Sequence, residues 1–500
     1  MRHKSPRLVL ILTIILAAVS FGCGLTSIFA PSEPTATPVP PTATPVPPTA
    51  TPIPPTPTLP EPRTVTLRPD GSGDYPDLST AVTNLVSGST IILDPGTFTL
   101  SAPLVIDKSL TIRGAGIQST FITSNTPNAV LTFTGTGNIV LQGINFTYTG
   151  TEWSYVVKIE GGGFDIRDCS FSGGVRNTDQ EIGGNGLFVL GSGNGSVRNC
   201  IFEGNQHHGL SIGDSVNVIV EYCTAKDNVH SGIGFWDSSA GTVRSCQSLY
   251  NEDGFTTSDQ TNVTFEENIA QGNIDFGFYA YDNAMMNANR NDSFENSLSG
   301  FGCSDEASCT FENNIAYHNA EIGFASFDQS TMTARYNESY SNGLHGFSIQ
   351  DQSQASLDYN LSYDNASVGF IVFDDAGMNA KNNDAYNNGS HGFGAQEQSS
   401  IYLAYNNISD NTKAGVRLSG TSISTVTDNN ISGNGLSGII ITDDAYASIV
   451  NNEIYNNLES AMAFFEFATG DVYGNWCSEN NDGISIYNSA EPYIGENNCQ

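Results

Sequence analysis

The chain has 500 residues, of which only 14% are charged and 51 are glycine. This composition excludes a coiled coil and a charge-rich disordered chain. Acidic residues outnumber basic ones 52 to 18, giving a net charge of −34. That charge argues against nucleic acid and anionic membrane surfaces as partners, because both bind through Lys and Arg. It would also repel a polyanionic substrate unless a divalent cation bridged the two.

The segment 1–23 has the pattern of an export signal. Basic residues within the first seven positions precede an apolar run over residues 8–18, which is shorter than the ~20 residues that a spanning helix needs. Ser20–Cys23 resembles a bacterial lipobox, which implies that Cys23 is lipidated and anchors the protein to the cell envelope. Secretion without an anchor is the alternative.

Residues 24–63 predict a stiff linker. Between Thr35 and Pro55 the unit Thr-Ala-Thr-Pro-Val/Ile-Pro-Pro occurs three times. Proline restricts φ and removes backbone donors, so this segment favours polyproline II over a globular fold. We interpret it as a spacer that holds residues 64–500 away from the envelope.

Residues 64–500 are dominated by a repeat of about 23 residues, a period that lies in the range typical of solenoids. One glycine recurs at a constant interval, except that two of the intervals are shorter by one position, and the register passes once through an alanine. Its positions are Gly186, Gly209, Gly232, Gly254, Gly277, Gly300, Gly323, Gly346, Gly369, Gly392, Gly415, Gly438, Ala461 and Gly483. Such fidelity predicts a solenoid.

Each repeat predicts three short strands. Phe follows the glycine in seven consecutive repeats, and apolar residues recur two positions later, which is the period of a strand with one inward face. Asp or Glu then marks a turn, and two columns of Asn mark further corners, where stacked amides would bond along the column. We therefore expect an all-β, single-stranded parallel β-helix, right-handed as parallel crossovers are. An amphipathic helix over Leu78 to Leu85 is expected to cap its N-terminal end, and no equivalent C-terminal cap is evident.

The unit Gly-Phe/Ile…Asp-x-Ser…Asn…Tyr-x-Asn resembles the parallel β-helix repeat of the pectate-lyase-like superfamily. The opening segments Val65–Tyr75, Ile91–Phe98 and Leu110–Gly116 resemble the start of pectin methylesterases. The resemblance implies a secreted protein that acts on polysaccharide, through lyase or hydrolase chemistry if it is an enzyme.

Candidate catalytic residues are few. Asp179, within Asn-Thr-Asp, and His208, within His-Gly, resemble parts of the polygalacturonase motifs, but the remaining parts are missing and His208 also simply precedes the repeat glycine. Residues 175–183 interrupt the repeat by eight residues, which is where such a scaffold places a functional loop. Arg417 and His391 are further candidate bases near the outer face of the first strand, and scattered surface residues are the alternative.

The acidic position of the turn predicts a row of carboxylates about 5 Å apart. Such a row recruits cations, and Ca²⁺ takes its oxygen ligands readily from carboxylates. The candidate calcium site comprises Asp282, Asp305, Asp328, Asp351 and Asp374. Alternatively, each Asp only hydrogen-bonds the backbone of its own turn.

Aromatic residues at the fourth position after the glycine are candidates for stacking against sugar rings. They are Trp236, Tyr281, Phe327 and Phe373, with Phe465 and Tyr487 further along. Packing against a neighbouring turn is the alternative.

Eight cysteines follow Cys23. We expect disulfides between Cys303 and Cys309, and between Cys477 and Cys499, which lie one repeat apart. The others should stack in one buried column: Cys169, Cys200, Cys223 and Cys246.

Together these features predict an exported β-helix that binds, and as an enzyme would process, extracellular polysaccharide, meeting the membrane only through its lipid anchor. The alternative is a non-catalytic surface scaffold or adhesin.

Overall fold

The computed structural model describes residues 60–499, which contain 55 strands and one short helix. The predicted export signal, Cys23 and most of the proline-rich linker lie outside these residues. Within the described residues, no helix is long and apolar enough to cross a membrane.

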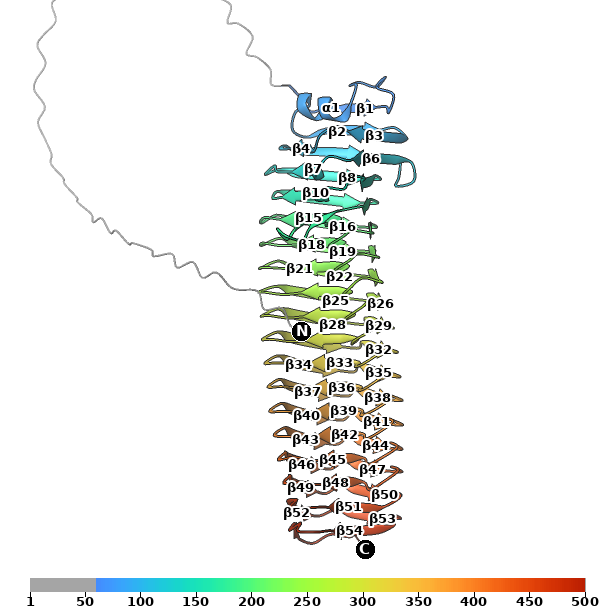
Figure 1. Ribbon diagram of the computed structural model, residues 1–500, viewed down its shortest axis with the longest axis vertical. Helices are drawn as coiled ribbons and strands as arrows, with labels where there is room; N and C mark the ends of the chain where they lie inside the picture. The colour runs from blue at the N-terminus through green and yellow to red at the C-terminus, as the bar shows by residue number, and fades with distance from the viewer. Residues whose placement is uncertain (1–59, 500) are drawn as a thin grey trace, which may run out of the picture. The chain divides into compact units, whose positions relative to one another are not determined.

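The strands stack into a column of rungs (Figure 1). A central rung contains β27 (Phe278–Ala280), β28 (Met285–Asn289) and β29 (Asp292–Phe294). Each strand pairs in parallel with its equivalent in the next rung, which produces three long sheets. Sheet A has 19 strands and runs from β1 (Thr64–Leu67) to β55 (Tyr493–Ile494). Sheet B runs from β3 (Gly96–Leu100) to β53 (Trp476–Ser478), and sheet C from β4 (Leu104–Ile106) to β54 (Asp482–Ile486). The predicted solenoid is confirmed.

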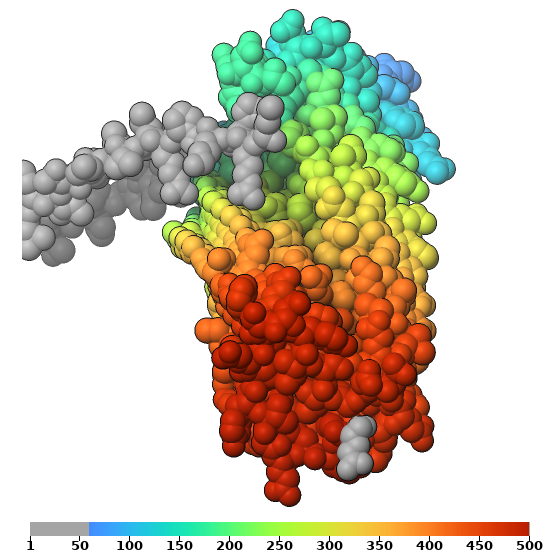
Figure 2. Space-filling model, turned by 60° about the horizontal axis from the view of Figure 1, so that its bottom comes forward, coloured from blue at the N-terminus to red at the C-terminus, as the bar shows by residue number. Residues whose placement is uncertain are grey.

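In-register pairing aligns equivalent side chains along the column. The phenylalanines that follow the repeat glycine are buried on sheet C, and their rings stack with centroids 4.6–4.8 Å apart from Phe255 to Phe393. Because each rung buries its inner face only against its neighbours, the core is a continuous stack. In the space-filling view the C-terminal rungs form one filled surface (Figure 2).

The two asparagine columns satisfy buried backbone groups between rungs. In the first, Asn314 Oδ1 accepts hydrogen bonds from the backbone N–H and the side-chain amide of Asn291, both at 2.9 Å. Its own amide donates to Ala288 O at 2.8 Å and to Asn337 Oδ1 at 3.0 Å. A buried amide with no hydrogen-bond partner lowers the stability of the fold by roughly 1–3 kcal/mol. Each asparagine avoids this cost for its own amide and for the backbone groups that it bonds.

The acidic turn residues bridge rungs, which differs from the expected bond within their own turn. Asp351 Oδ2 accepts the N–H of Asp328 at 3.1 Å, and Asp374 Oδ2 accepts that of Asp351 at 3.1 Å. These residues have φ of 55–59°. Asp tolerates this left-handed conformation better than most residues, which explains its recurrence.

The N-terminal end carries the predicted helix. Helix α1 (Leu78–Asn84) begins at Asp77, whose Oδ1 accepts the Thr80 N–H at 2.7 Å. It buries Leu78, Ala81 and Val82 against the first rungs. This helix covers strand edges that would otherwise be open.

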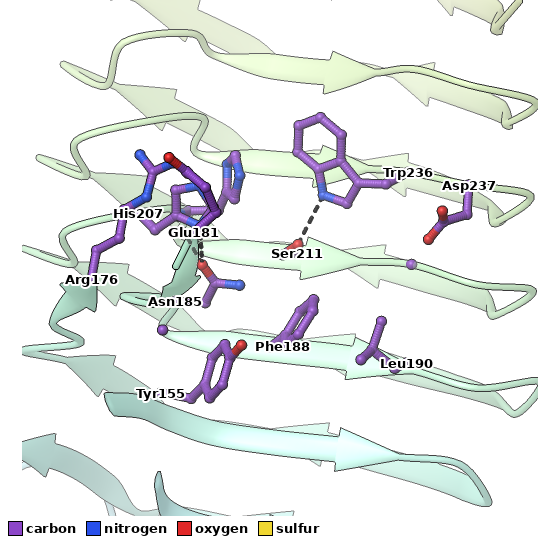
Figure 3. Close-up of a pocket in the computed structure, with 13 residues that line it drawn as sticks. Tyr155, Arg176, Glu181, Asn185, Phe188, Leu190, His207, Ser211, Trp236 and Asp237 are labelled. Carbon is purple, nitrogen blue, oxygen red and sulfur yellow. Dashed lines mark hydrogen bonds and ion pairs between the residues drawn. The ribbon is translucent and has the colours of Figure 1, made fainter. Parts of the chain in front are cut away.

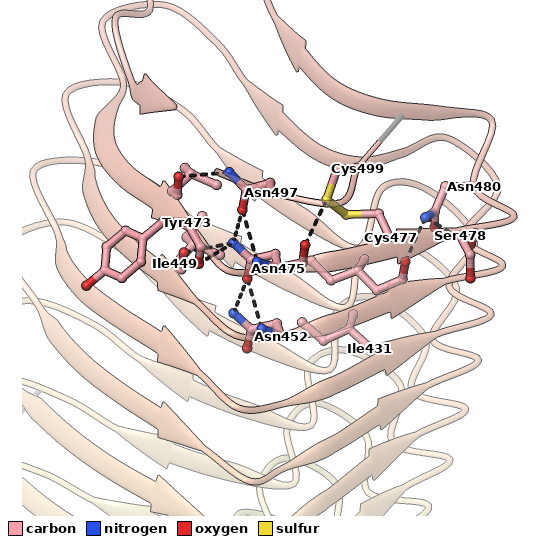
Figure 4. Close-up of a disulfide and its surroundings, with 12 residues drawn as sticks. Ile431, Ile449, Asn452, Tyr473, Asn475, Cys477, Ser478, Asn480, Asn497 and Cys499 are labelled. Atoms are coloured by element: carbon pink, nitrogen blue, oxygen red, sulfur yellow. Dashed lines mark hydrogen bonds between the residues drawn. A yellow bond between two sulfur atoms is a disulfide. The ribbon is translucent and has the colours of Figure 1, made fainter. Parts of the chain in front are cut away.

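Both expected cysteine pairs are joined by disulfides. Cys303 and Cys309 have Cα atoms 6.3 Å apart, and Cys477 and Cys499 have Cα atoms 4.5 Å apart. The second disulfide lies beside the last steps of the Asn452–Asn475–Asn497 ladder (Figure 4). The other four described cysteines are free and buried.

Candidate functional site

The eight-residue interruption of the repeat forms a small hairpin on sheet C. Its strands β13 (Arg176–Asn177) and β14 (Ile182–Gly183) pair antiparallel, and Val175 bridges to Ser154 at the start of β10 (Ser154–Glu160). The hairpin borders a cavity of about 350 Å³ (Figure 3). This is the size at which ligand pockets begin.

One side of the cavity is aromatic. Tyr155 on β10 stacks on Phe188 of β15 (Leu187–Leu190), with centroids 5.0 Å apart. Trp236 follows β21 (Ile233–Phe235), and its indole N–H donates to Ser211 Oγ at 2.8 Å. The Lys158 ammonium lies 5.2 Å from the Tyr155 ring. These aromatic rings suit a ligand with a flat apolar face.

The other side holds two histidines. His207 and His208 have ring centroids 3.9 Å apart, and His208 lies 4.8 Å from Trp236. Burial, reinforced by the charges of Arg176 and His230, lowers the pKa of His207 to about 3. Burial also lowers the pKa of His208 well below its usual value. Both rings are therefore neutral near pH 7, and His208 Nδ1 is buried without a hydrogen-bond partner.

A network of charged side chains positions Arg176. Its guanidinium contacts Glu181 within the hairpin and His230 Nε2 on a neighbouring rung. His230 Nδ1 in turn lies 2.6 Å from Glu252 Oε2, and this hydrogen bond lowers the pKa of Glu252. Arg176 Nε remains buried and without a partner. Arg176 and His208 thus each keep one buried nitrogen without a partner within the described residues.

Asp253 lies one rung beyond His230. Its Oδ1 accepts the Phe276 N–H at 3.1 Å, and burial raises its pKa to about 7. Its charge also contributes to raising the pKa values of Tyr279 and Tyr281. Asp253 is not among the residues that line the cavity.

The structure separates the four sequence-based catalytic candidates. His208 lines the cavity, but Asp179 is exposed on the hairpin and its N–H bonds to Asn177 Oδ1 at 3.0 Å. His391 lies near β42 (Phe393–Ala395), where its Nδ1 accepts the Ala414 N–H at 3.2 Å and burial lowers its pKa to about 4. Arg417 is half-buried on the outer face of β45 (Val416–Leu418). His391 thus satisfies a backbone donor, and neither it nor Arg417 lines the cavity.

The predicted binding rows also separate. Trp236 lines the cavity, and the ring centroids of Trp236 and Tyr281 lie 6.4 Å apart. Phe327 and Phe373 are half-buried further along the same edge of sheet C. Asp328, Asp351 and Asp374 border a second hollow of about 380 Å³. Among residues 60–499, no three acidic, histidine or cysteine side chains converge as metal ligands would. The row presents carboxylates in line, and calcium binding to it stays a prediction.

Sequence reasoning missed Tyr155, Phe188, the Arg176–His230–Glu252 network and Asp253. The signal available for Arg176 was its place within the inserted residues. The others look like ordinary repeat positions, since nothing in their local sequence distinguishes them.

Comparison with known proteins supports the fold. The profile of the right-handed β-helix region matches residues 154–300, 289–404 and 369–500. The chain belongs to this right-handed β-helix family. The resemblance to pectin methylesterases at residues 65–116 lies before the matched segments and stays a prediction. No curated protein matches the chain significantly.

Solved structures share the fold at low identity. The periplasmic alginate epimerase AlgG is 12% identical with a TM-score of 0.39, over 80% of this chain and 84% of that protein. The A-module of the Azotobacter vinelandii mannuronan C-5 epimerase AlgE6 is 16% identical with a TM-score of 0.29, over 84% and 94%. An N-terminal fragment of bacteriophage Phi29 gene product 12 is 11% identical with a TM-score of 0.47, over 82% and 90%. These similarities concern the fold alone.

Proposed function

We propose that this protein binds an extracellular polysaccharide in the cavity beside the Arg176–Gly183 hairpin. The observation that carries the proposal is an aromatic wall of Tyr155, Phe188 and Trp236 in one cavity with the polar side chains of Arg176, Asn185 and His207. A sugar offers an apolar ring face to the aromatic wall and oxygen acceptors to the polar side chains.

Processing of the bound chain is the enzymatic form of the proposal. The candidate acid–base groups are the carboxyl and imidazole side chains that line the cavity, among them Glu181, Asp237 and His207. Arg176 of the hairpin lies outside the repeat and contacts His230, which in turn contacts Glu252 at the equivalent position of the next rung. A lyase or a hydrolase is the reaction class that such groups serve.

Export and anchoring complete the proposal. The apolar run over residues 8–18 and the lipobox-like Ser20–Cys23 support export and lipid attachment, and the proline-rich linker would carry the β-helix outward. The acidic surface would keep such a protein soluble and away from anionic lipid.

A glycan array, run with and without EDTA and followed by titration calorimetry, tests the proposal. Trp236→Ala and Tyr155→Ala should each weaken binding of the best glycan, because each removes a stacking surface. The control is Tyr487→Ala, which removes an aromatic from the same edge near the C-terminal end. If no glycan binds, or if Trp236→Ala binds as the wild type does, the scaffold or adhesin function replaces this one.

A further inference from the structure

The outer edge of sheet C alternates between two kinds of side chain. Counting from the repeat glycine, the fourth position is aromatic on every second rung, at Trp236, Tyr281, Phe327 and Phe373. The rungs between them carry Ser258, Ser304, Gln350 and Gln396. The alternation ends after Gln396: Ser419 and Thr442 follow, and Phe465 and Tyr487 are then aromatic on two consecutive rungs.

These aromatics form a wall with a regular spacing. Strands of neighbouring rungs lie about 4.8 Å apart, so aromatics two rungs apart recur at about 9.6 Å. Trp236 departs from this spacing, because its larger ring approaches Tyr281 to 6.4 Å. All four residues are half-buried, and the Tyr281 ring stacks on Tyr279 with centroids 5.2 Å apart.

The floor beside the wall is flat and partly apolar. Phe276 stacks on Tyr279 with centroids 4.3 Å apart, and the pair covers Gly302, where a Cβ would approach the Phe276 ring to 2.7 Å. Further along, Ala325 and Ser348 are fully buried in the floor. Ala325 and Ser348 are covered by neighbouring side chains, so an extended chain would lie over that cover and along the aromatic edge.

The two-rung period also occurs inside the central rungs. In the buried core, Met286, Met332 and Met378 also recur on every second rung. In the interior this period only organises packing. On the outer wall, aromatic side chains with the same period would contact a bound ligand.

We infer that this wall selects polysaccharides with a two-fold screw, in which successive sugars face opposite ways. The inference rests on the proposed function. In an extended chain joined through equatorial 1,4 bonds, the advance per sugar is close to the spacing of the rungs, and equivalent ring faces recur on every second sugar. Such a chain, lying along the stack, would place one sugar on each aromatic and its flipped neighbour against the polar rung between. Chains that coil, such as α-1,4-linked glucose, lose this register after one or two contacts.

The test compares β-1,4-linked oligosaccharides of glucose, mannose, xylose and N-acetylglucosamine, from two to eight sugars, with α-1,4- and β-1,3-linked glucose series. We expect a β-1,4-linked series to bind best and its affinity to rise in steps of two sugars. Each aromatic engaged should contribute roughly two- to tenfold. Preference for an α-1,4- or β-1,3-linked series, or a smooth rise with every sugar, would overturn the inference.

A register swap supplies the matched control. The double variant Phe327→Gln with Gln350→Phe keeps the composition of the wall but moves one aromatic to the wrong rung. It should lose affinity for long oligosaccharides by about as much as Phe327→Ala, whereas Gln350→Ala should bind as the wild type does. Melting temperatures identify a variant that fails to fold. If the double variant does not fold, the affinity of Phe327→Ala for long oligosaccharides tests the inference by itself. If the swap binds normally, only the number of aromatics matters and the inference fails while the proposed function stands. If no glycan binds at all, the proposed function fails and takes this inference with it.

Discussion

Burial shifts the pKa values of two single side chains, Asp253 and His207, in opposite directions. The pKa of Asp253 is raised to about 7, so the folded state holds a proton that the unfolded state releases near pH 4. Its contribution to stability is present below pH 4 and is lost as the pH rises through 7. The pKa of His207 is lowered to about 3, so its contribution is present above pH 6.5 and is lost as the pH falls.

Asp253→Asn isolates the first effect. Asn cannot ionise, yet it can still accept the Phe276 N–H. We expect the variant to match the wild type at pH 4 and to be more stable at pH 8, by on the order of 3 kcal/mol. Thermal unfolding at both pH values measures the difference, with the exposed Asp364→Asn as control. Equal stability of variant and wild type at pH 8 would show that Asp253 ionises freely.

At the scale of elements, the acidic turns show how one residue type can serve two purposes. Each Asp adopts a left-handed conformation and bonds the backbone of the preceding rung through one oxygen. The carboxylates nevertheless remain in line at the spacing of the rungs, where like charges repel. Cations held between neighbours would relieve this repulsion.

Calcium should therefore raise the melting temperature of the wild type, because a ligand that binds only the folded state stabilises it. Asp328→Asn with Asp351→Asn should abolish most of this effect and leave the fold intact, since Asn tolerates the left-handed turn and keeps an acceptor. Asp364→Asn with Asp410→Asn, exposed left-handed positions at another corner, serves as the control. A wild type that ignores calcium would leave the row as a set of turn-forming residues.

At the scale of the molecule, different parts of the chain bear on the stability of the β-helix and on where the protein is located. Each rung depends on its neighbours, so the terminal rungs would fray first, and α1 at one end and the Cys477–Cys499 disulfide at the other restrain them. In our proposal, location depends on residues 1–63, most of which lie outside the described structure. With a net charge of −34, the chain would not stay at an anionic membrane without an anchor.

Cys23→Ala tests that anchor. If Cys23 is lipidated, the variant should move from the membrane fraction to the medium, because one cysteine carries the whole attachment. Immunoblots of fractionated cells measure the distribution, and Cys169→Ala, a buried cysteine of the β-helix, is the control. Finding wild type and variant in the same fraction would leave export without lipidation.

The sequence by itself determined the solenoid, its three strands per rung, the asparagine columns, the capping helix and the pairing of Cys303 with Cys309 and of Cys477 with Cys499. These features recur in every rung. Because the rungs stack in register, residues one repeat apart in the sequence lie next to one another in the structure. The cavity could not be predicted in this way, because it depends on an insertion that breaks the period. Arg176 meets His230 across 54 residues, and His230 meets Glu252 on the next rung. Only the tertiary structure decided how the hairpin lies on sheet C, since that depends on the packing of non-repeating side chains, and it thereby brought Arg176, His208 and Trp236 around one cavity.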